Sequence, residues 1–320
     1  MHHHHSSLVY HMTKPSLKFT RRTVQIGVAA AFVAIPILNR WRIDKVYGNF
    51  LSFSAAGVPL ADPLAALQVT VTGWVWPRDL WIGAAIALVL ALGLGAVFCS
   101  WVCPFGLLSE WMFELGQRVL PQKYEGWKTR SNGFPLKAGI FSLGLLAVVF
   151  FFGSPVLSHL SMPGWYSRIF QMWFLQQHVS LAIGLILLVL LAEFLARNRF
   201  WCRYICPQAF LLTVAKLADP YRLQVGFHQE KCTCHKGYDP CQEACSLALN
   251  PKTLANIWET ECNNCGDCVV VCKKMGQALT LGFGAAAVRS RMMEKEGNKS
   301  QASPMSGEMD RGSKALQKEK

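Results

Sequence analysis

Apolar positions follow one another almost without interruption in four stretches of the chain, with polar and basic segments between them. The stretches cover residues 23–39, 80–98, 137–157 and 179–196. Each is close to the length that a helix needs to cross the hydrocarbon core of a bilayer, about 17 to 25 residues. Four apolar helices of this length would need a soluble core far larger than this chain can provide. We therefore expect a mainly α membrane protein with about four transmembrane helices.

The composition agrees with this pattern. Of the 320 residues, 52% are hydrophobic and 16% are charged, and the mean hydropathy is +0.25. The net charge of +13 would also fit a nucleic-acid partner, but Lys and Arg gather between the apolar stretches and in the tails, as in the cytoplasmic loops of membrane proteins. We expect the chain to partner a membrane and no nucleic acid. The basic flanks place both ends of the chain in the cytoplasm.

The same pattern divides the chain into four parts. We expect a cytoplasmic N-terminal extension over 1–22, a four-span membrane domain over 23–219, a small α+β domain over 220–284 and a disordered tail over 285–320. The histidines at positions 2–5 are interpreted as an added extension, since Met12 offers a second start. Arg21 and Arg22 precede the first apolar stretch, as in a twin-arginine export signal, but no small-residue cleavage site follows. We interpret them as the flank of an uncleaved span, with export as the alternative.

Eight of the twelve cysteines lie between positions 232 and 272. The run ECNNCGDCVVVC has the spacing C-x-x-C-x-x-C-x-x-x-C, in which three thiolates of one tight loop reach one [4Fe–4S] cluster, while the fourth ligates the other cluster in two-cluster ferredoxins. The upstream half has the irregular spacing C-x-C-x6-C-x3-C. The expected ligand sets are Cys232, Cys234, Cys241 and Cys272 for one cluster, and Cys245, Cys262, Cys265 and Cys268 for the other. A zinc ribbon is the alternative, but zinc sites usually pair two C-x-x-C turns across a longer loop.

The remaining cysteines mark an internal repeat. The segments FCSWVCPFGLLSEW and FWCRYICPQAFLLTVAK follow the second and fourth apolar stretches, and each contains C-x-x-x-C-P. Pro104 and Pro207 suit the first turn of a new helix, where a missing N–H costs nothing. We expect the two repeats to converge at the cytoplasmic edge of the helix bundle. Their cysteines could hold a third centre, form redox-active dithiols, or pack as small apolar side chains: Cys99, Cys103, Cys202 and Cys206.

Three ionisable side chains are weak candidates for binding a substrate or moving protons. Glu193 is the only carboxylate inside an apolar stretch, and an acid at that depth is a functional candidate by default. It stands four residues before Arg197, so an exposed ion pair near the helix end is the simpler interpretation. Asp62 and His178 fall in the outside loops, where we expect them to be solvated. No residue is identified as catalytic, and the chain has no phosphate-binding loop and no dinucleotide fingerprint.

With these motifs placed, the chain resembles the membrane polyferredoxins typified by the quinol-dehydrogenase membrane subunit of periplasmic nitrate reductase systems, the NapH type. The resemblance covers nearly all of residues 20–282, including the outside loop GNFLSFSAAGVPLADPLAALQ, both C-x-x-x-C-P motifs and the paired half-sites. It implies a multi-pass protein of the bacterial inner membrane. It further implies that electrons pass from the quinol pool through [4Fe–4S] clusters to a ferredoxin-type or cytochrome partner of a periplasmic reductase or dehydrogenase system.

The sequence departs from that family pattern in two places. The half-site KCTCHKGYDPCQEAC lacks the regular ferredoxin spacing, and Lys273 follows Cys272 where a proline is usual. The chain is comparably similar to the ferredoxin-type membrane protein of methylamine-utilization clusters, the MauN type. That resemblance implies electron transfer for methylamine dehydrogenase, or its maturation. A zinc-binding membrane regulatory protein is the second alternative. Whether the chain is an enzyme subunit, as a quinol dehydrogenase would be, is left open.

Overall fold

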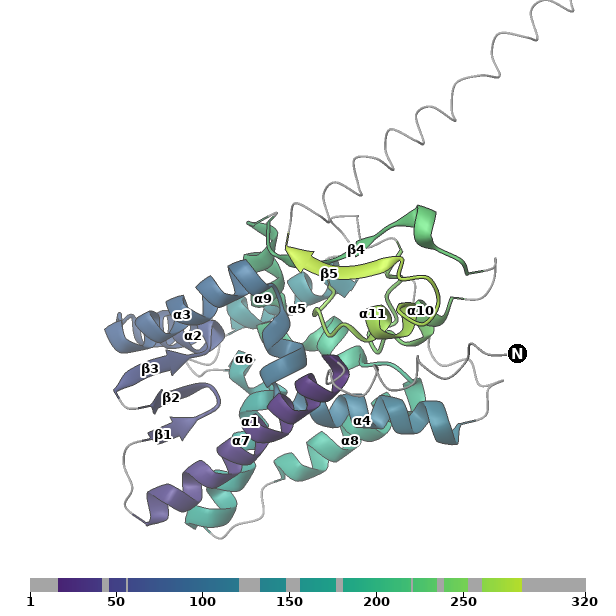
Figure 1. Cartoon of the computed structure of the whole chain (residues 1–320). Coiled ribbons are helices and arrows are strands. Elements are labelled where there is room, and N and C mark those ends of the chain that lie inside the picture. The colour runs from purple at the N-terminus through teal and green to yellow at the C-terminus, as the bar shows by residue number, and fades with distance from the viewer. Residues whose placement is uncertain are drawn as a thin grey trace, which may run out of the picture.

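The computed structural model describes residues 17–41, 46–55, 57–120, 133–147, 156–176, 181–219, 221–234, 239–252 and 261–283. The predictions for the histidines at 2–5, for the tail over 285–320 and for His178 lie outside these residues. The described chain is mainly helical, as expected, and contains two small antiparallel sheets (Figure 1).

Four helices overlap the four apolar stretches of the sequence. They are α1 (Leu17–Arg40), α3 (Arg78–Leu94), α5 (Gly133–Ala147) and α8 (Ala182–Ala196). Of the described helices, α1 alone is long and apolar enough to cross a membrane by itself, while α8 and the part of α5 over Phe134–Ala147 are shorter apolar helices. One such helix is weak support for a membrane protein, so the four-span interpretation must rest on other features.

The outward faces of these helices are apolar. Large exposed side chains are Ile82, Val89 and Leu90 on α3, Leu136, Leu143 and Leu146 on α5, and Leu185, Leu187, Leu188, Leu191 and Leu195 on α8. Contiguous apolar surface of this kind is uncommon on water-soluble monomers. The helices therefore present a surface that needs a cover other than water.

Each C-x-x-x-C-P motif folds in the same way. A π-helical turn, η1 (Phe98–Val102) or η4 (Trp201–Ile205), carries the first cysteine of the motif. The second cysteine has an extended backbone and caps a new helix, either α4 (Pro104–Val119) or α9 (Pro207–Leu217). The prediction that both prolines begin helices is confirmed. Proline suits the first helical position, where the backbone N–H would have no partner.

The first segment that we expected to be an outside loop is folded, and it packs against α1 and α3. Strands β1 (Val46–Asn49), β2 (Ser52–Ala55) and β3 (Val58–Ala61) form a sheet between α1 and α3, and α2 (Pro63–Gly73) follows (Figure 1). A Cβ added at Gly83 of α3 would lie only 2.7 Å from the backbone nitrogen of Ala61. The ring of Phe50 lies 5.5 Å from that of Phe98, the residue before Cys99. The segment therefore reaches the first cysteine motif.

The second segment that we expected outside also packs inward. It contains α6 (Val156–His159), α7 (Met162–Gln171) and the π-helical turn η3 (Met172–Gln176). Leu157 and Met162 are fully buried, and Leu51 of the first segment packs against Gly164. Both segments are too short and too rich in Gly and Pro to be distinguished from loops by hydropathy, so their burial is a tertiary effect.

The cysteine-rich C-terminal segment forms a small α+β unit. Strand β4 (Leu223–Phe227) pairs antiparallel with β5 (Leu279–Phe283), and Val225 lies opposite Leu281. The short helices η5 (Gln229–Lys231), α10 (Pro240–Glu243) and α11 (Asp267–Cys272) accompany this sheet (Figure 1). The core of the unit consists of Val225, Cys241, Cys268, Val269, Cys272, Ala278 and Leu279. Cysteines thus make up much of its interior.

Candidate metal centres

The four cysteines of the repeated motifs border one cavity, which holds about 560 Å³ of empty space. Cys99 and Cys202 lie in the two π-helical turns, and Cys103 and Cys206 are the N-cap residues of α4 and α9. The two repeats therefore meet, and we call this group of four cysteines site A. Other residues of the cavity wall are Phe98, Phe105, Met162 and Trp201.

The backbone at site A depends on one glycine. The backbone nitrogen of Gly106 donates to the Sγ of Cys103 at 3.3 Å. A Cβ added at Gly106 would lie 2.6 Å from the carbonyl oxygen of Cys99. The first turn of α4 thus packs directly against the turn that carries the first cysteine, and its N–H favours the anionic form of the second.

Burial keeps the thiols of site A protonated at neutral pH unless a cation binds them. It raises the pKa of Cys99 to about 11 and the pKa of Cys206 to about 12, and in each case a neighbouring thiol of site A adds to the effect. Burial also raises the pKa of Cys202 to about 12. Metal ligation requires the thiolate. Bound iron would therefore have to supply the charge that ionises these side chains.

Buried cations surround site A. Lys137, Arg199 and Lys216 are each at most 3% exposed. Arg199 Nη2 donates to the Sγ of Cys202 at 3.7 Å, and Lys137 lines the cavity itself. Lys216 Nζ donates to the carbonyl oxygen of Cys262 at 2.8 Å, and burial lowers its pKa to about 8. Buried cations need nearby anions. Arg199 pairs with Glu110 at 3.0 Å, and Lys137 lies 3.9 Å from Glu261. A thiolate-ligated cluster would add further negative charge at site A.

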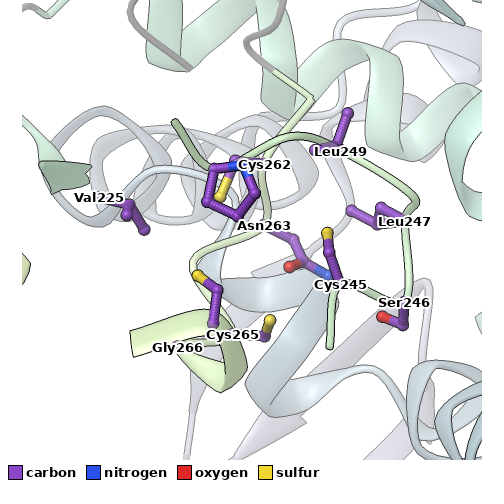
Figure 2. Close-up of a pocket in the computed structure, with 11 residues that line it drawn as sticks. Val225, Cys245, Ser246, Leu247, Leu249, Cys262, Asn263, Cys265 and Gly266 are labelled. Carbon is purple, nitrogen blue, oxygen red and sulfur yellow. The ribbon is translucent and has the colours of Figure 1, made fainter. Parts of the chain in front are cut away.

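A second cavity, of about 380 Å³, is bordered by the second ligand set expected from the spacing, which we call site B (Figure 2). Its cysteines are Cys245, Cys262, Cys265 and Cys268. The loop between them turns tightly because Asn264 and Gly266 adopt positive φ angles of 55° and 79°, which Asn and Gly tolerate better than other residues. Burial raises the pKa of Cys245 to about 11.

The other expected ligand set, Cys232, Cys234, Cys241 and Cys272, is called site C. Cys241 and Cys272 are buried in the core of the C-terminal unit, and Cys232 packs against this core. Burial raises the pKa of Cys241, and the nearby thiols of Cys272 and Cys234 raise it further. The pKa of Cys234 is raised in the same way by burial and by Cys232. Cys241 and Cys272 therefore lie in one core, with Cys232 beside them.

The three sites are consecutive neighbours. Leu247 and Asn263 line the cavities of both site A and site B. Ser100, inside the first repeat, donates to the carbonyl oxygen of Asn263 at 2.6 Å. Sites B and C meet in the core of the C-terminal unit, where Cys268 and Cys241 pack together. Site B therefore lies between site A and site C.

The arrangement suits clusters better than single metal ions. All twelve cysteines are free thiols. In the part of the chain that the structure describes, no three His, Cys, Asp or Glu side chains are grouped to hold one metal ion. A single zinc ion draws its ligands toward one point, whereas a cluster of four iron atoms holds them apart around a cage. At sites A and B the cysteines surround a cavity.

Asp62 is buried, so the expectation that it would be solvated is wrong. Its side chain is 4% exposed, because its segment folds inward. One carboxyl oxygen accepts from the backbone nitrogen of Leu64 at 3.1 Å and caps α2. The other, Oδ2, has no partner among the described residues. Burial raises the pKa of Asp62 to about 7, which allows this carboxyl to exchange protons near neutral pH.

Glu193 is also fully buried, which contradicts the expected exposed pair with Arg197. Its carboxylate accepts hydrogen bonds from Ser109 Oγ and from the backbone nitrogen of Trp201, the latter at 3.2 Å. Arg197 reaches Gln117 on α4. Glu193 therefore holds α4 and the start of η4 together.

Motif spacing did not predict the charged residues around the sites. Arg21, interpreted as part of a basic flank, is fully buried and pairs with Glu110 and Asp267. Arg22 pairs with Glu110 and Glu114. The fold thus uses both arginines internally. The acidic residues of α4 could have indicated buried ion pairs, but the sequence does not show which basic residues pair with them.

Comparisons with known proteins agree with this geometry. The family model of a 4Fe-4S binding domain matches residues 79–122 and 177–218, which contain the two halves of site A. The ferredoxin-type protein NapH of Escherichia coli is 26% identical over 283 residues, covering 83% of this chain and 90% of the relative. The methylamine utilization ferredoxin-type protein MauN of Methylorubrum extorquens is 27% identical over 231 residues, covering 70% and 74%. No solved structure matches the chain.

A 4Fe-4S binding domain that occurs twice, once around each half of site A, makes this chain an iron–sulfur electron-transfer protein of the ferredoxin type. Within that class, the chain is related to the ferredoxin-type proteins NapH and MauN, the resemblance that the motifs predicted.

Proposed function

We propose that the chain is a multi-pass membrane protein that takes electrons from quinol and passes them through three [4Fe–4S] clusters, held at sites A, B and C in that order, to a redox partner. The observation that carries this proposal is the shared wall between sites A and B. Site A lies among the helices that overlap the apolar stretches, and site B lies in the C-terminal unit. Leu247 and Asn263 separate them.

The apolar outward faces favour the membrane part of the proposal. Leu187, Leu188 and Leu191 of α8 are each more than half exposed, at 60%, 64% and 55%. Acyl chains would cover this surface at no cost in polar contacts. Trp74 and Trp76, between α2 and α3, are also exposed, and Trp is enriched where membrane meets water.

A bound cluster would supply a one-electron acceptor that needs no proton. The chain would supply everything around it. The cysteine thiolates of each site would hold the iron, and the buried cations Lys137, Arg199 and Lys216 would balance the negative charge at site A. The matches of the 4Fe-4S binding domain to both repeats favour a third centre there over simple thiol packing.

Quinol oxidation needs a proton acceptor as well as an electron acceptor, because quinol releases two protons with its two electrons. Asp62 suits this role, because one of its buried carboxyl oxygens has no partner within the described residues. Its segment reaches site A through the contact of Phe50 with Phe98. Glu193, which bonds to the turn that carries Cys202, is the second candidate.

The recipient of the electrons would be a ferredoxin-type or cytochrome partner of a periplasmic reductase or dehydrogenase system. The charges of the loops favour a cytoplasmic C-terminal unit in the bacterial inner membrane. The MauN relatives support a second candidate function, which is electron transfer for methylamine dehydrogenase or its maturation. The two candidates share all three sites and differ in the partner.

Metal analysis of the anaerobically purified protein tests the proposal. Three [4Fe–4S] clusters predict about 12 iron and about 12 sulfide per chain, with broad visible absorption. A value of about 8 iron would leave site A without a cluster and contradict the entry point. A colourless preparation that contains zinc and no sulfide would contradict the whole proposal and support the zinc-binding alternative.

A further inference from the structure

A row of buried charged side chains connects site A to site B, and ligation does not explain it. Glu110 of α4, which is 2% exposed, stands at its centre. Its Oε1 accepts hydrogen bonds from Arg21 Nη1 at 2.5 Å and from Arg199 Nη1 at 3.0 Å. Its Oε2 lies 3.3 Å from Arg22 Nη1. One carboxylate therefore faces three guanidinium groups.

Arg199 forms the end of this row at site A. The same guanidinium that contacts Glu110 donates through Nη2 to the Sγ of Cys202 at 3.7 Å. Its Nε donates to Ser109 Oγ at 3.1 Å, which fixes the plane of the guanidinium. The backbone nitrogen of Arg199 donates to the carbonyl oxygen of Ser246 at 2.9 Å, one residue from Cys245 of site B. Arg199 thus borders both sites.

Arg21 forms the end at site B. Its Nη2 contacts both carboxyl oxygens of Asp267, at 2.9 and 3.0 Å. Asp267 is the first residue of α11 and stands between Cys265 and Cys268. The side chain of Arg21 is fully buried. The guanidinium therefore lies beside the cluster loop, shielded from water.

We propose that Glu110 is a positioning residue that sets the reduction potentials of sites A and B together, by balancing and orienting the arginines that border them. This inference rests on the proposed function, since it needs clusters at both sites. Arginine stays protonated in proteins, so the side chain of Glu110 lies among three permanent positive charges.

The sign of the effect follows from charge. Reduction adds one negative charge to a cluster, so a nearby anion opposes reduction and a nearby cation favours it, and burial strengthens both effects. Removing the charge of Glu110 leaves the two arginines less balanced. The potentials of both sites should then rise, whereas site C has no contact with Glu110 and should stay unchanged.

The chain offers a matched control one turn further along α4. Glu114 also pairs with Arg22, at 2.8 Å, and with Lys18, at 2.7 Å. Its side chain is 30% exposed, against 2% for Glu110. Solvent screens a charge at such a position. Glu114→Gln removes the same charge from the same helix without touching either site.

The experiment compares the full-length protein with Glu110→Gln and Glu114→Gln by electron paramagnetic resonance during redox titration in detergent. The signal of site A is identified by its absence from Cys99→Ser/Cys202→Ser. Iron and sulfide are measured first, so missing clusters in the unaltered protein would overturn the proposed function rather than this inference. We expect Glu110→Gln to keep its iron, to raise the potentials of sites A and B, and to leave site C unchanged, with no shift in Glu114→Gln.

Unchanged potentials in an iron-replete Glu110→Gln protein would overturn the inference, and so would equal shifts in both variants. If Glu110→Gln does not accumulate, Asp267→Asn serves instead, because it removes an anion from the site B end of the row. That variant should raise the potential of site B more than that of site A. An equal effect on both sites, or none, would overturn the inference.

Discussion

Asp62 shows how the inward fold changes the chemistry of a single side chain. The pKa of its carboxyl is about 7 in the folded protein, against an ordinary value of 3.8. Between these values the folded state binds a proton that the unfolded state releases, so the free energy of unfolding falls as the pH rises, by about 1.4 kcal/mol per pH unit at most. Above about pH 7 the loss is complete.

We expect Asp62→Asn to flatten this part of the pH profile, because the amide does not titrate. The measurement is the thermal unfolding midpoint in detergent between about pH 4 and 8, a range that spans both ends of the titration. Asp79→Asn, at an exposed position in the first turn of α3, is the control and should keep the slope. A slope in Asp62→Asn equal to that of the control would contradict the assigned burial.

Gly106 tests the geometry of site A at the same scale. Gly106→Ala would place a Cβ 2.6 Å from the carbonyl oxygen of Cys99, and the turn would have to move. We expect the loss of the site A cluster, about a third of the total iron. Gly139→Ala on α5, where a Cβ would meet nothing within 4 Å, should keep all its iron. Full iron in Gly106→Ala would show that site A tolerates displacement of its turn.

The spacing of the cysteines predicts a ligand set, but it does not predict the charged side chains around it. The spacing of Cys262, Cys265 and Cys268 names a site because one short loop supplies all three. Arg21 and Glu110 are 89 positions apart, and nothing local in the sequence pairs them. For this reason Arg21 was interpreted as a flank.

At the scale of elements, the segment from Cys262 to Cys268, which runs into the first turn of α11, gives the clearest prediction. Because each of its three cysteines should supply one thiolate to site B, changing any one of them to Ala should remove about half of the iron held by the C-terminal unit. Ser246→Ala lines the same cavity without offering a thiol and should change nothing. Unchanged iron and sulfide in all three cysteine variants would rule out site B as assigned.

Hydropathy predicted helices α1, α3, α5 and α8, because each overlaps a long apolar run. It failed for β1–β3, α2 and α7, which are short segments containing Gly and Pro that bury their side chains only by packing against other elements. The burial of Asp62 was not predicted for the same reason. The duplicated C-x-x-x-C-P motif did predict two equivalent turns, since Pro at the first helical position fixes where each helix starts.

At the scale of the whole molecule, the proposed orientation makes a direct prediction. A reporter enzyme that is active only in the periplasm should be silent when fused after Ala287, because the loop charges favour a cytoplasmic C-terminal unit. The same reporter fused between α2 and α3, near Trp76, should be active. Strong activity of the Ala287 fusion would reverse the orientation and favour export of the C-terminal unit.

The contacts by which the C-terminal unit docks on the helices could not be predicted from the sequence. That docking is made by long-range contacts, such as Ser100 with Asn263 and Arg21 with Asp267. These contacts bring site B against site A, which the proposed route from the helices to site C requires.

The most direct test of this route is quinol-driven reduction of the protein with Cys99→Ser and Cys202→Ser together. In the unaltered protein, a soluble quinol analogue should reduce sites B and C. The reduction is monitored by the bleaching of the visible absorption and by electron paramagnetic resonance. In the double variant, quinol-driven reduction should be abolished while dithionite still reduces both sites. Reduction by quinol at the original rate in the double variant would contradict the account, because electrons would then enter without site A.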